Sequence, residues 1–364
     1  MKSYETSRSQ LQPCLRSWRG HAKIPRFVQP TRYRKDFSMR SLKNLFRVRR
    51  PKQTPGPDAR VQPQLRQWNS NPSEQPWFDQ PNALELLEQR RKTQSLSDRD
   101  FEDLRHWVNN GYVVTEDVVR TRDIDGMLRD LDDVWTTTKP LENLVIEDLR
   151  IRPEDPPGVR HTALVTLDQP QKEKLKRQYH WRIHTFYEHS KSTDRIFHNK
   201  ELIRLCSLIL DRPTDPYATI NFTFGSSQNL HQDTAVFFVS PRNYLLGAWL
   251  ACEDVHPDSG PLVYYPGSHK ETLFPKFDNY PQTNLKTCSR EMSDQYYAYL
   301  DDVSRRYERK TFIAKKGQVF LWHGMMIHGG DAIRNPELTR RSYVSHYIPH
   351  ELNKVFEVVG PFNW

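Results

Sequence analysis

From residue 217 onward, short runs of β-branched and aromatic residues alternate with Gly, Pro and Asn, which favour turns. Short strands separated by such turn signals are typical of antiparallel sheets in barrels and jelly rolls. The pattern therefore predicts a mainly β fold with flanking helices (α+β). The predicted strands are residues 217–224, 234–239, 244–252, 261–265, 311–314, 318–322 and 341–348.

Before this β-rich part, the apolar residues follow helical spacing. Ser97 and Asp100 have the spacing of a capping box, and Gly111 ends the apolar pattern that follows them. The Pro-rich segment 150–175 is predicted to be a loop. The other elements predicted here are a strand at 112–119 and helices at 124–135 and 199–210.

Basic residues are concentrated at the N-terminal end of the 364-residue chain. Residues 1–75 carry 17 Lys and Arg against four acidic residues, so their net charge is +13 and the rest of the chain carries −4. Residues 1–76 are also rich in Pro, Gln and Ser, which indicates a disordered or loosely attached extension. One folded domain is predicted for residues 77–364, in which segment 271–310 interrupts the β pattern.

The sequence also bears on the cellular compartment. No apolar run approaches the length of a transmembrane helix, and no apolar stretch follows Lys2 as it would in a secretory signal. The four cysteines are scattered and form no CxxC pair. Free thiols in a reducing compartment are therefore expected, not disulfides or a zinc site. These features predict a cytoplasmic protein.

Residues 38–52 place Met39, Leu42, Leu45 and Phe46 at helical spacing among basic side chains. A basic amphipathic helix in peripheral contact with an anionic membrane is one interpretation, and a solvated helix docked on its own domain is the other. The segment is also Arg-rich and acid-poor enough for an organelle transit peptide. Nucleic-acid binding is not expected, because the main body is acidic and carries no recognition motif.

The stretch NLHQDTAVFF, residues 229–238, contains candidate metal ligands. Residues i and i+2 of a strand share a face, so His231 and Asp233 are predicted to point the same way. His328, which follows the predicted strand 318–322 and precedes two glycines, is the best third ligand. Two imidazoles and one carboxylate form the facial triad of non-haem Fe(II) oxygenases, which leaves positions open for a co-substrate and O2.

Arg340 begins the last predicted strand, 12 residues beyond His328. A buried guanidinium at this place can hold a dicarboxylate through a bidentate pair. The alternative for Arg340 is an ion pair with a surface glutamate, and the adjacent Arg341 is a second candidate for the same role.

Other histidines leave alternatives open. A chance HxD pair can be hydrogen-bonded within a core, and His323 is an alternative to His328 as third ligand. Three histidines at helical spacing are expected on a helix surface or in the core, with substrate contact as the alternative. They are His180, His184 and His189.

Three segments carry a resemblance to a known family: INFTFGSSQNLHQDTAVFF, GAWLACEDVHPDSGPLVYYPGSHK and GQVFLWHGMMIHGG…TRRSYVSHY. In their order and spacing they resemble the phytanoyl-CoA dioxygenase family. The resemblance extends from about residue 97 to about residue 350. It implies a double-stranded β-helix core of the jelly-roll or cupin type, with Fe(II) as metal and 2-oxoglutarate and O2 as co-substrates.

The resemblance also implies roles for individual residues. His231, Asp233 and His328 match the metal ligands of the family. Arg340 matches the arginine that holds the distal carboxylate of 2-oxoglutarate. The residues that match positions near this co-substrate are Trp249, Asn221 and Gln228.

The sequence departs from the family pattern at two places. Family members often carry Ser or Thr two residues after the distal histidine, whereas this chain has Gly330. One hydrogen bond to the co-substrate is therefore missing or is supplied by another group. The interval from His328 to Arg340 is also slightly long, which keeps Arg341 as a candidate.

The implied reaction is hydroxylation of an unactivated C–H bond. The presence of Asp233 favours hydroxylation over halogenation, since halogenases of this fold have a small residue in place of that carboxylate. Segment 271–310 is interpreted as a lid over the site. The basic extension favours an anionic or membrane-borne substrate, such as an acyl lipid or a lipid-linked sugar. The alternatives are a soluble metabolite, an acyl-CoA, or a non-catalytic membrane-anchored binding protein, and no oligomeric state is predicted.

Overall fold

The computed structural model describes residues 75–178, 180–237 and 239–352. All of these lie within the compact unit Gln64–Trp364. The basic segment 38–52 lies outside the described residues, so its predicted membrane contact stays a prediction. The predicted domain boundary between residues 76 and 77 also stays a prediction. No helix in the described part of the chain is long and apolar enough to cross a membrane.

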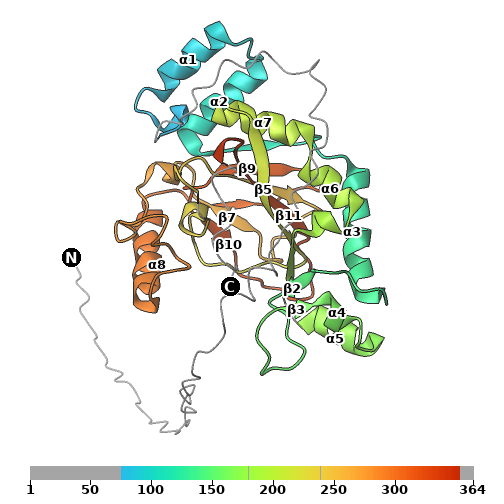
Figure 1. Ribbon diagram of the computed structural model, residues 1–364. Helices are drawn as coiled ribbons and strands as arrows, with labels where there is room; N and C mark the ends of the chain where they lie inside the picture. The colour runs from blue at the N-terminus through green and yellow to red at the C-terminus, as the bar shows by residue number, and fades with distance from the viewer. Residues whose placement is uncertain (1–74, 179, 238, 353–364) are drawn as a thin grey trace, which may run out of the picture. The chain divides into compact units, whose positions relative to one another are not determined.

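The strands form two antiparallel sheets (Figure 1). The larger has the order β1-β9-β6-β11-β5-β4-β2-β3, and the smaller has the order β10-β7-β8. Strands that are distant in the chain are neighbours in both sheets, as in a jelly roll, which confirms the predicted double-stranded β-helix core with flanking helices. The strands are β1 (Tyr112–Thr115), β2 (Val145–Glu147), β3 (Val159–Arg160), β4 (Arg182–His184), β5 (Thr214–Phe222), β6 (Leu246–Ala251), β7 (Leu262–Tyr264), β8 (Lys310–Phe312), β9 (Val319–His323), β10 (His328–Gly330) and β11 (Ser342–Pro349).

The helices lie mainly before the β-rich part, as predicted. The loop predicted for segment 150–175 is wrong, because the structure has a short strand and two helices there. Helix α4 is only four residues long and α5 is mostly polar, so neither carries a helical apolar pattern. The α-helices are α1 (Ala83–Thr93), α2 (Asp98–Asn110), α3 (Thr121–Thr136), α4 (His161–Leu164), α5 (Gln169–Gln178), α6 (Lys191–Phe197), α7 (Lys200–Leu210) and α8 (Arg290–Ser304).

The central strands β6, β9 and β11 are buried along their whole length, so most residues on both of their faces are apolar. On β9, Phe320 and Trp322 point into the space between the two sheets. Val319 and Leu321 alternate with them and pack against apolar residues from α2, α3, α6 and α7. The larger sheet therefore has a helix-covered outer face and an inner face that borders the space between the sheets.

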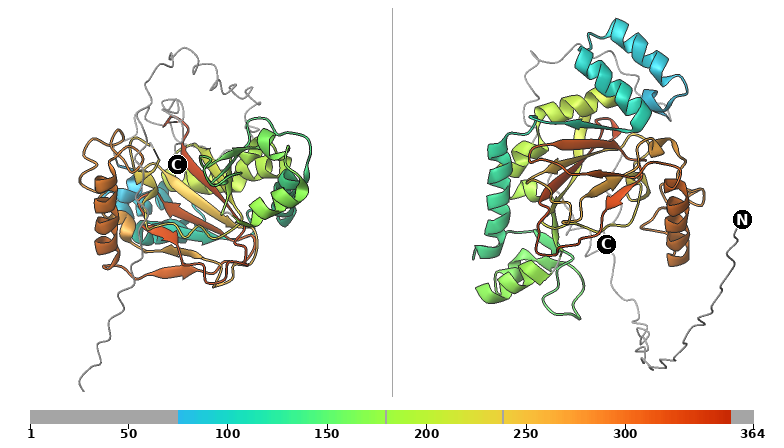
Figure 2. Two further views of the ribbon diagram at one scale, coloured as in Figure 1. Left: turned by 90° about the horizontal axis from the view of Figure 1, so that it is seen from below. Right: turned by 180° about the vertical axis from the view of Figure 1, so that it is seen from behind.

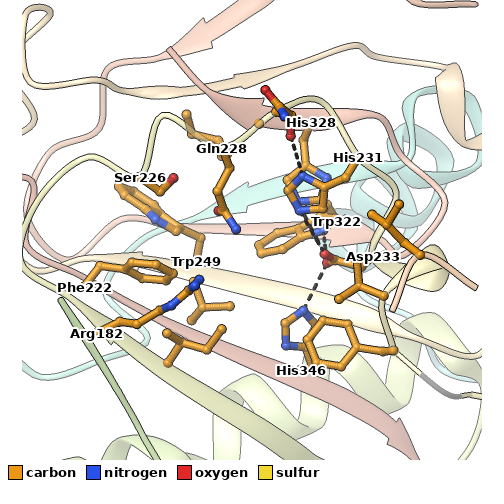
Figure 3. Close-up of a pocket in the computed structure, with 18 of the residues that line it drawn as sticks. Arg182, Phe222, Ser226, Gln228, His231, Asp233, Trp249, Trp322, His328 and His346 are labelled. Atoms are coloured by element: carbon orange, nitrogen blue, oxygen red, sulfur yellow. Dashed lines mark hydrogen bonds and ion pairs between the residues drawn. The ribbon is translucent and has the colours of Figure 1, made fainter. Parts of the chain in front are cut away.

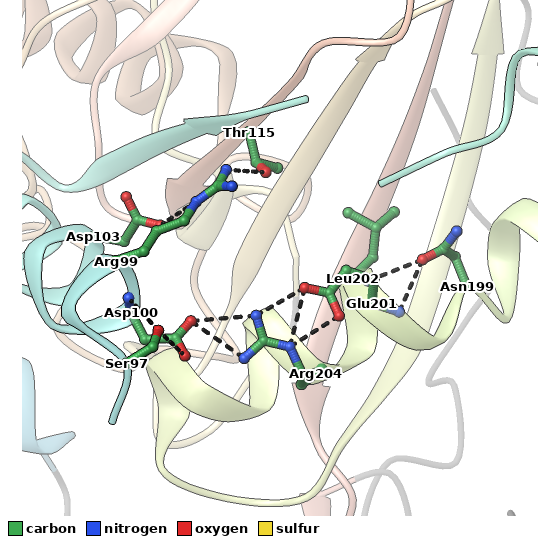
Figure 4. A network of polar contacts seen from close by, with 9 residues as sticks. All are labelled: Ser97, Arg99, Asp100, Asp103, Thr115, Asn199, Glu201, Leu202 and Arg204. Carbon is green, nitrogen blue, oxygen red and sulfur yellow. Dashed lines mark hydrogen bonds and ion pairs between the residues drawn. The ribbon is translucent and has the colours of Figure 1, made fainter. Parts of the chain in front are cut away.

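A polar network fixes helices α2 and α7 against each other (Figure 4). The Ser97 hydroxyl accepts a hydrogen bond from the N–H of Asp100, as the capping-box spacing predicted, and Asn199 caps α7 in the same way. Arg204 of α7 contacts Asp100 at 3.2 Å and Glu201 at 2.7 Å. Side-chain caps of this kind typically contribute about 1 kcal/mol each, so sequence-local signals determine where both helices begin.

Segment 271–310 consists of an irregular stretch followed by helix α8. Figures 1 and 2 place α8 on one side of the strands and helices α3 and α6 on the opposite side. Phe274, Phe277, Tyr296 and Leu300 of this segment form a separate apolar cluster with residues of neighbouring loops. The segment is thus packed on the β core, and its role as a lid stays a prediction.

Candidate metal and co-substrate site

A cavity of about 390 Å³ opens between the two sheets. Its walls come from β4, β5, β6, β9 and β11 of the larger sheet, from β7 and β10 of the smaller one, and from neighbouring loops. His231, Asp233 and His328 lie together on one wall (Figure 3). The structure therefore brings the three predicted ligands into one site.

The HxD segment is not the strand that the sequence predicted. His231 forms an isolated bridge with His328, with N–H to carbonyl distances of 2.9 and 3.1 Å in the two directions. Asp233 then begins a 3-10 helix, Asp233–Ala235, so the predicted strand 234–239 is wrong. A residue of helix α8 stabilises this turn, because the hydroxyl of Tyr296 accepts a hydrogen bond from the backbone N–H of Gln232 at 2.9 Å. The shared direction of the two ligands comes from this bridge and turn.

Both histidines present the same ring nitrogen to the carboxylate. The Nε2 atoms of His231 and His328 lie 3.5 and 3.6 Å from Oδ1 of Asp233. Their Nδ1 atoms lie 2.8 Å from the carbonyl of Asn229 and 3.0 Å from that of Met326. A carbonyl can only accept, so each Nδ1 carries a hydrogen, and each Nε2 is the ring atom that faces Asp233 and could bind a metal ion. Such contacts orient metal-binding histidines in proteins.

The other carboxylate oxygen of Asp233 is held by two buried donors. Nε1 of Trp322 donates to Oδ2 at 2.8 Å, and Nε2 of His346 donates to it at 3.0 Å. Oδ1 therefore remains directed at the two ligand histidines. Neither donor was predicted as a site residue. The available sequence signal was weak, because each is a single residue within a buried strand, and the sequence alone does not show which strand residues face Asp233.

The electrostatics of the cluster suit a cation. Burial lowers the pKa of His328 to about 4, so its imidazole is neutral and can act as a ligand. Burial alone would raise the pKa of Asp233, but His328 and His346 beside it hold that pKa well below its usual range. Asp233 is therefore ionised although it is buried.

The donor set fits a divalent metal with open coordination positions. One ligand atom from each of His231, Asp233 and His328 lies within 4.8 Å of the other two. In the described ranges, this is the one group of three or more such residues with that geometry. Two imidazoles and a carboxylate on one side are the set used by non-haem Fe(II) proteins, whereas structural zinc sites are closed by four ligands.

Arg340 is a buried cation on the same cavity. Its side chain lies between the rings of Phe222 and Trp249, with the guanidinium carbon 6.0 and 5.8 Å from their centroids. Nη1 donates to the carbonyl of Gly260 at 3.0 Å, and Nε has no hydrogen-bond partner among the described residues. No described acidic side chain lies within 4.0 Å of it. Burial lowers the pKa of Arg340 to about 10, so it stays charged at neutral pH and suits an incoming carboxylate.

The structure separates the two candidate arginines. Arg341 points away from the cavity and contacts Asp132 at 3.4 Å and Glu253 at 4.0 Å. It is therefore an ion-pairing residue of the outer face, as strand alternation requires when its neighbour Arg340 faces inward. The alternative ion-pair interpretation applies to Arg341 and not to Arg340.

The remaining predicted co-substrate residues divide into two groups. Trp249 and Gln228 line the cavity. Asn221 does not, because it alternates on β5 with Ile220 and Phe222, which face the cavity. The Asn221 amide instead contacts Sδ of Met127 on α3 at 3.2 Å. The predicted role of Asn221 is corrected accordingly.

The alternative histidines occupy other places. Nε2 of His323 lies 3.2 Å from a carboxylate oxygen of Asp79, and Nδ1 accepts the N–H of Met325. The predicted helical arrangement of the three upstream histidines is wrong, because strand β4 and a 3-10 turn occupy this stretch. The described residues that line the cavity include none of these three histidines, which are His180, His184 and His189.

The surroundings of Gly330 show why this chain has a glycine where family members often have Ser or Thr. A Cβ there would lie 2.8 Å from the backbone nitrogen of Ser227, so the site has no room for a serine or threonine. The hydroxyl of Ser226 lies 3.0 Å from that same point, and Ser226 lines the cavity. Ser226, from the neighbouring loop, thus offers a hydroxyl group to the cavity close to Gly330.

Removing the indole donor should weaken metal binding. We expect Trp322→Phe to lower Fe(II) affinity by about 10- to 100-fold, because ligand-orienting partners typically contribute that much. Trp107→Phe is a matched control, since Trp107 is fully buried and its Nε1 has no hydrogen-bond partner among the described residues. Anaerobic calorimetric titration with Fe(II) measures both. Equal affinities of the two variants would contradict the assigned role of Trp322.

An internal cavity with two histidines and a carboxylate, on a double-stranded β-helix, defines the class of facial-triad proteins. Within that class, the chain belongs to the phytanoyl-CoA dioxygenase (PhyH) family, whose model matches residues 107–342. The family predicted from the three sequence segments is therefore confirmed.

Curated relatives agree with this assignment. Peroxisomal phytanoyl-CoA dioxygenase of Bos taurus is 25% identical over 236 residues, covering 65% of this chain and 63% of that protein. The Homo sapiens protein is 24% identical over 231 residues, covering 63% of this chain and 62% of its own length. The chain thus spans less than two thirds of the length of these relatives. Among solved structures, EctD from S. alaskensis with 2-oxoglutarate and 5-hydroxyectoine is similar, at 16% identity and a TM-score of 0.49, covering 71% of this chain and 77% of that one.

Proposed function

We propose that this protein is an Fe(II)- and 2-oxoglutarate-dependent dioxygenase that hydroxylates an unactivated C–H bond of an organic substrate. The observation that carries the proposal is one cavity that holds both an open triad of metal-type ligands and a buried, uncompensated arginine. Family membership supports it, since curated relatives are named as dioxygenases.

The chain's own residues have distinct parts in this proposal. His231 and His328 hold Fe(II) through Nε2, and Asp233 holds it through Oδ1. Arg340 binds the distal carboxylate of 2-oxoglutarate, and the rings of Phe222 and Trp249 flank that contact and exclude water.

When bound, the metal and 2-oxoglutarate supply the oxidising chemistry. Together with O2 they would yield succinate and CO2 from 2-oxoglutarate, with one oxygen atom of O2 entering succinate and the other the substrate. The protein contributes ligands held in fixed positions on the cavity wall.

Succinate formation tests this proposal directly. The full-length protein with Fe(II), 2-oxoglutarate and O2 should release succinate, and candidate substrates should gain one oxygen in mass spectrometry. The non-catalytic alternative predicts binding without succinate under any condition. Absence of 2-oxoglutarate binding to the Fe(II)-loaded protein would overturn the proposal.

For the substrate, we keep the hypothesis of an anionic or membrane-borne molecule. It is supported by the net charge of +13 on residues 1–75 and by the apolar residues at helical spacing within 38–52. A soluble metabolite or an acyl-CoA is the alternative. No oligomeric state is proposed.

Deleting residues 1–76 provides the test of this hypothesis. We expect the deletion to abolish sedimentation with anionic vesicles and to leave 2-oxoglutarate turnover intact, because every proposed site residue lies beyond position 180. Each nearby Lys or Arg contributes about 1 kcal/mol to attraction by an anionic leaflet, and salt screens it. Charge reversal at Arg47, Arg49 and Arg50 should mimic the deletion. If the full-length protein ignores anionic vesicles at low salt, the membrane hypothesis fails.

A further inference from the structure

Two cations on the cavity wall have no part in the proposed function so far. The charges of Fe(II) and of doubly ionised 2-oxoglutarate cancel, and those of Asp233 and Arg340 cancel likewise. Of the described Lys, Arg, Asp and Glu side chains that line the cavity, only Arg182 and Lys286 then remain. Arg182 and Lys286 are thus the two cationic side chains of the cavity wall that have no role in holding the metal or the co-substrate.

Arg182 is aimed into the cavity by its strand. It lies opposite Phe222 in the pairing of β4 with β5, so both side chains are on the inner face. In Figure 3 its guanidinium reaches toward the cavity from the side of Phe222, across from His231 and Asp233. Only 14% of the side chain is exposed.

The acidic partners of Arg182 lie behind it. Nη2 contacts Asp148 at 2.7 Å, and Nε lies 3.7 Å from Glu147. Neither carboxylate is among the described residues that line the cavity. The acids therefore hold the guanidinium from its outer side, while the side chain lines the cavity.

Lys286 comes from a different part of the fold, in segment 271–310. Its Nζ lies 5.5 Å from the ring centroid of Phe237. Burial lowers the pKa of Lys286 to about 8, partly offset by Glu147, so the amine is still mainly protonated at neutral pH.

We propose that Arg182 and Lys286 form a subsite that binds a negatively charged group, a carboxylate or a phosphate, on the organic substrate. This rests on the proposed function, because it treats the metal and 2-oxoglutarate as already bound. It also gives the substrate an orientation, with its anionic end at β4 and its apolar part along Phe222 and Trp249. The subsite is distinct from Arg340, which serves the co-substrate.

Three matched probes test the subsite: hexanoate, hexyl phosphate and 1-hexanol. They are titrated calorimetrically, without O2, into full-length protein loaded with Fe(II) and saturating 2-oxoglutarate. An anionic probe should bind about 10- to 100-fold more tightly than hexanol, as expected for charge-assisted contacts. The ranking of hexanoate against hexyl phosphate distinguishes a carboxylate from a phosphate.

Variants connect the preference to the two cations. Arg182→Gln and Lys286→Gln should each reduce the preference for the anionic probe by about 10-fold or more. Lys286→Gln is the independent test, because Arg182→Gln also breaks the ion pair with Asp148 and can destabilise the fold. Arg212→Gln is the matched control, since Arg212 is equally buried, pairs with Glu351 and lies outside the cavity lining.

The outcomes separate the two proposals. The subsite is wrong if the protein binds 2-oxoglutarate normally but shows no preference for either anion, and the proposed function then stands. It is also wrong if the preference survives in both variants, or if higher 2-oxoglutarate concentrations abolish it, which would place the anion at Arg340. Failure of the wild-type protein to bind Fe(II) or 2-oxoglutarate overturns the proposed function itself.

Discussion

Replacing Asp233 by alanine is expected to abolish hydroxylation and to lower Fe(II) affinity by more than about 100-fold, beyond the loss typical of an orienting partner. The reason is geometric, because Oδ1 of Asp233 is the single oxygen that faces both ligand histidines. Anaerobic Fe(II) titration and succinate release measure the two effects. Near-normal turnover with added Fe(II) would contradict the triad assignment.

A matched control is needed, since Asp233→Ala also leaves the donors Trp322 and His346 without their acceptor. Asp132→Ala removes another ion-paired carboxylate, one that contacts Lys176 and Arg341 and does not line the cavity. It should keep full Fe(II) affinity. Thermal unfolding of both variants without metal shows whether Asp233→Ala retains the fold, which we expect.

Replacing Arg340 by glutamine is expected to raise the dissociation constant for 2-oxoglutarate by about 10- to 100-fold, the typical loss for a charge-assisted contact to a carboxylate. Arg341→Gln is the neighbouring control and should change this constant far less, because Arg341 pairs with Asp132 and Glu253 on the outer face. Titrating the Fe(II)-loaded protein with 2-oxoglutarate in the absence of O2 compares the variants. A larger effect at Arg341 would show that the assigned inner face of β11 is wrong.

The sequence predicted those parts of the molecule that depend on near neighbours in the chain. The cap at Ser97 and the stop at Gly111 were predicted correctly, because capping hydrogen bonds and the left-handed backbone at the glycine involve only local residues. Most strands were also found, since turn residues bound each β run. Segment 150–175 and the HxD stretch were misassigned, because short or polar elements carry too little periodicity for such an argument.

The three candidate metal ligands could be chosen from the sequence, through residue type, spacing and family resemblance. Their geometry and surroundings were decided by the tertiary structure. His346 and Trp322, which hold Asp233, are 113 and 89 residues away from it in the chain. Asn221 and Arg182 show the same limit, since the direction of a strand residue depends on which face borders the cavity. Chain-local patterns determine elements and candidate chemistry, whereas only packing between distant segments determines which side chains share one buried space.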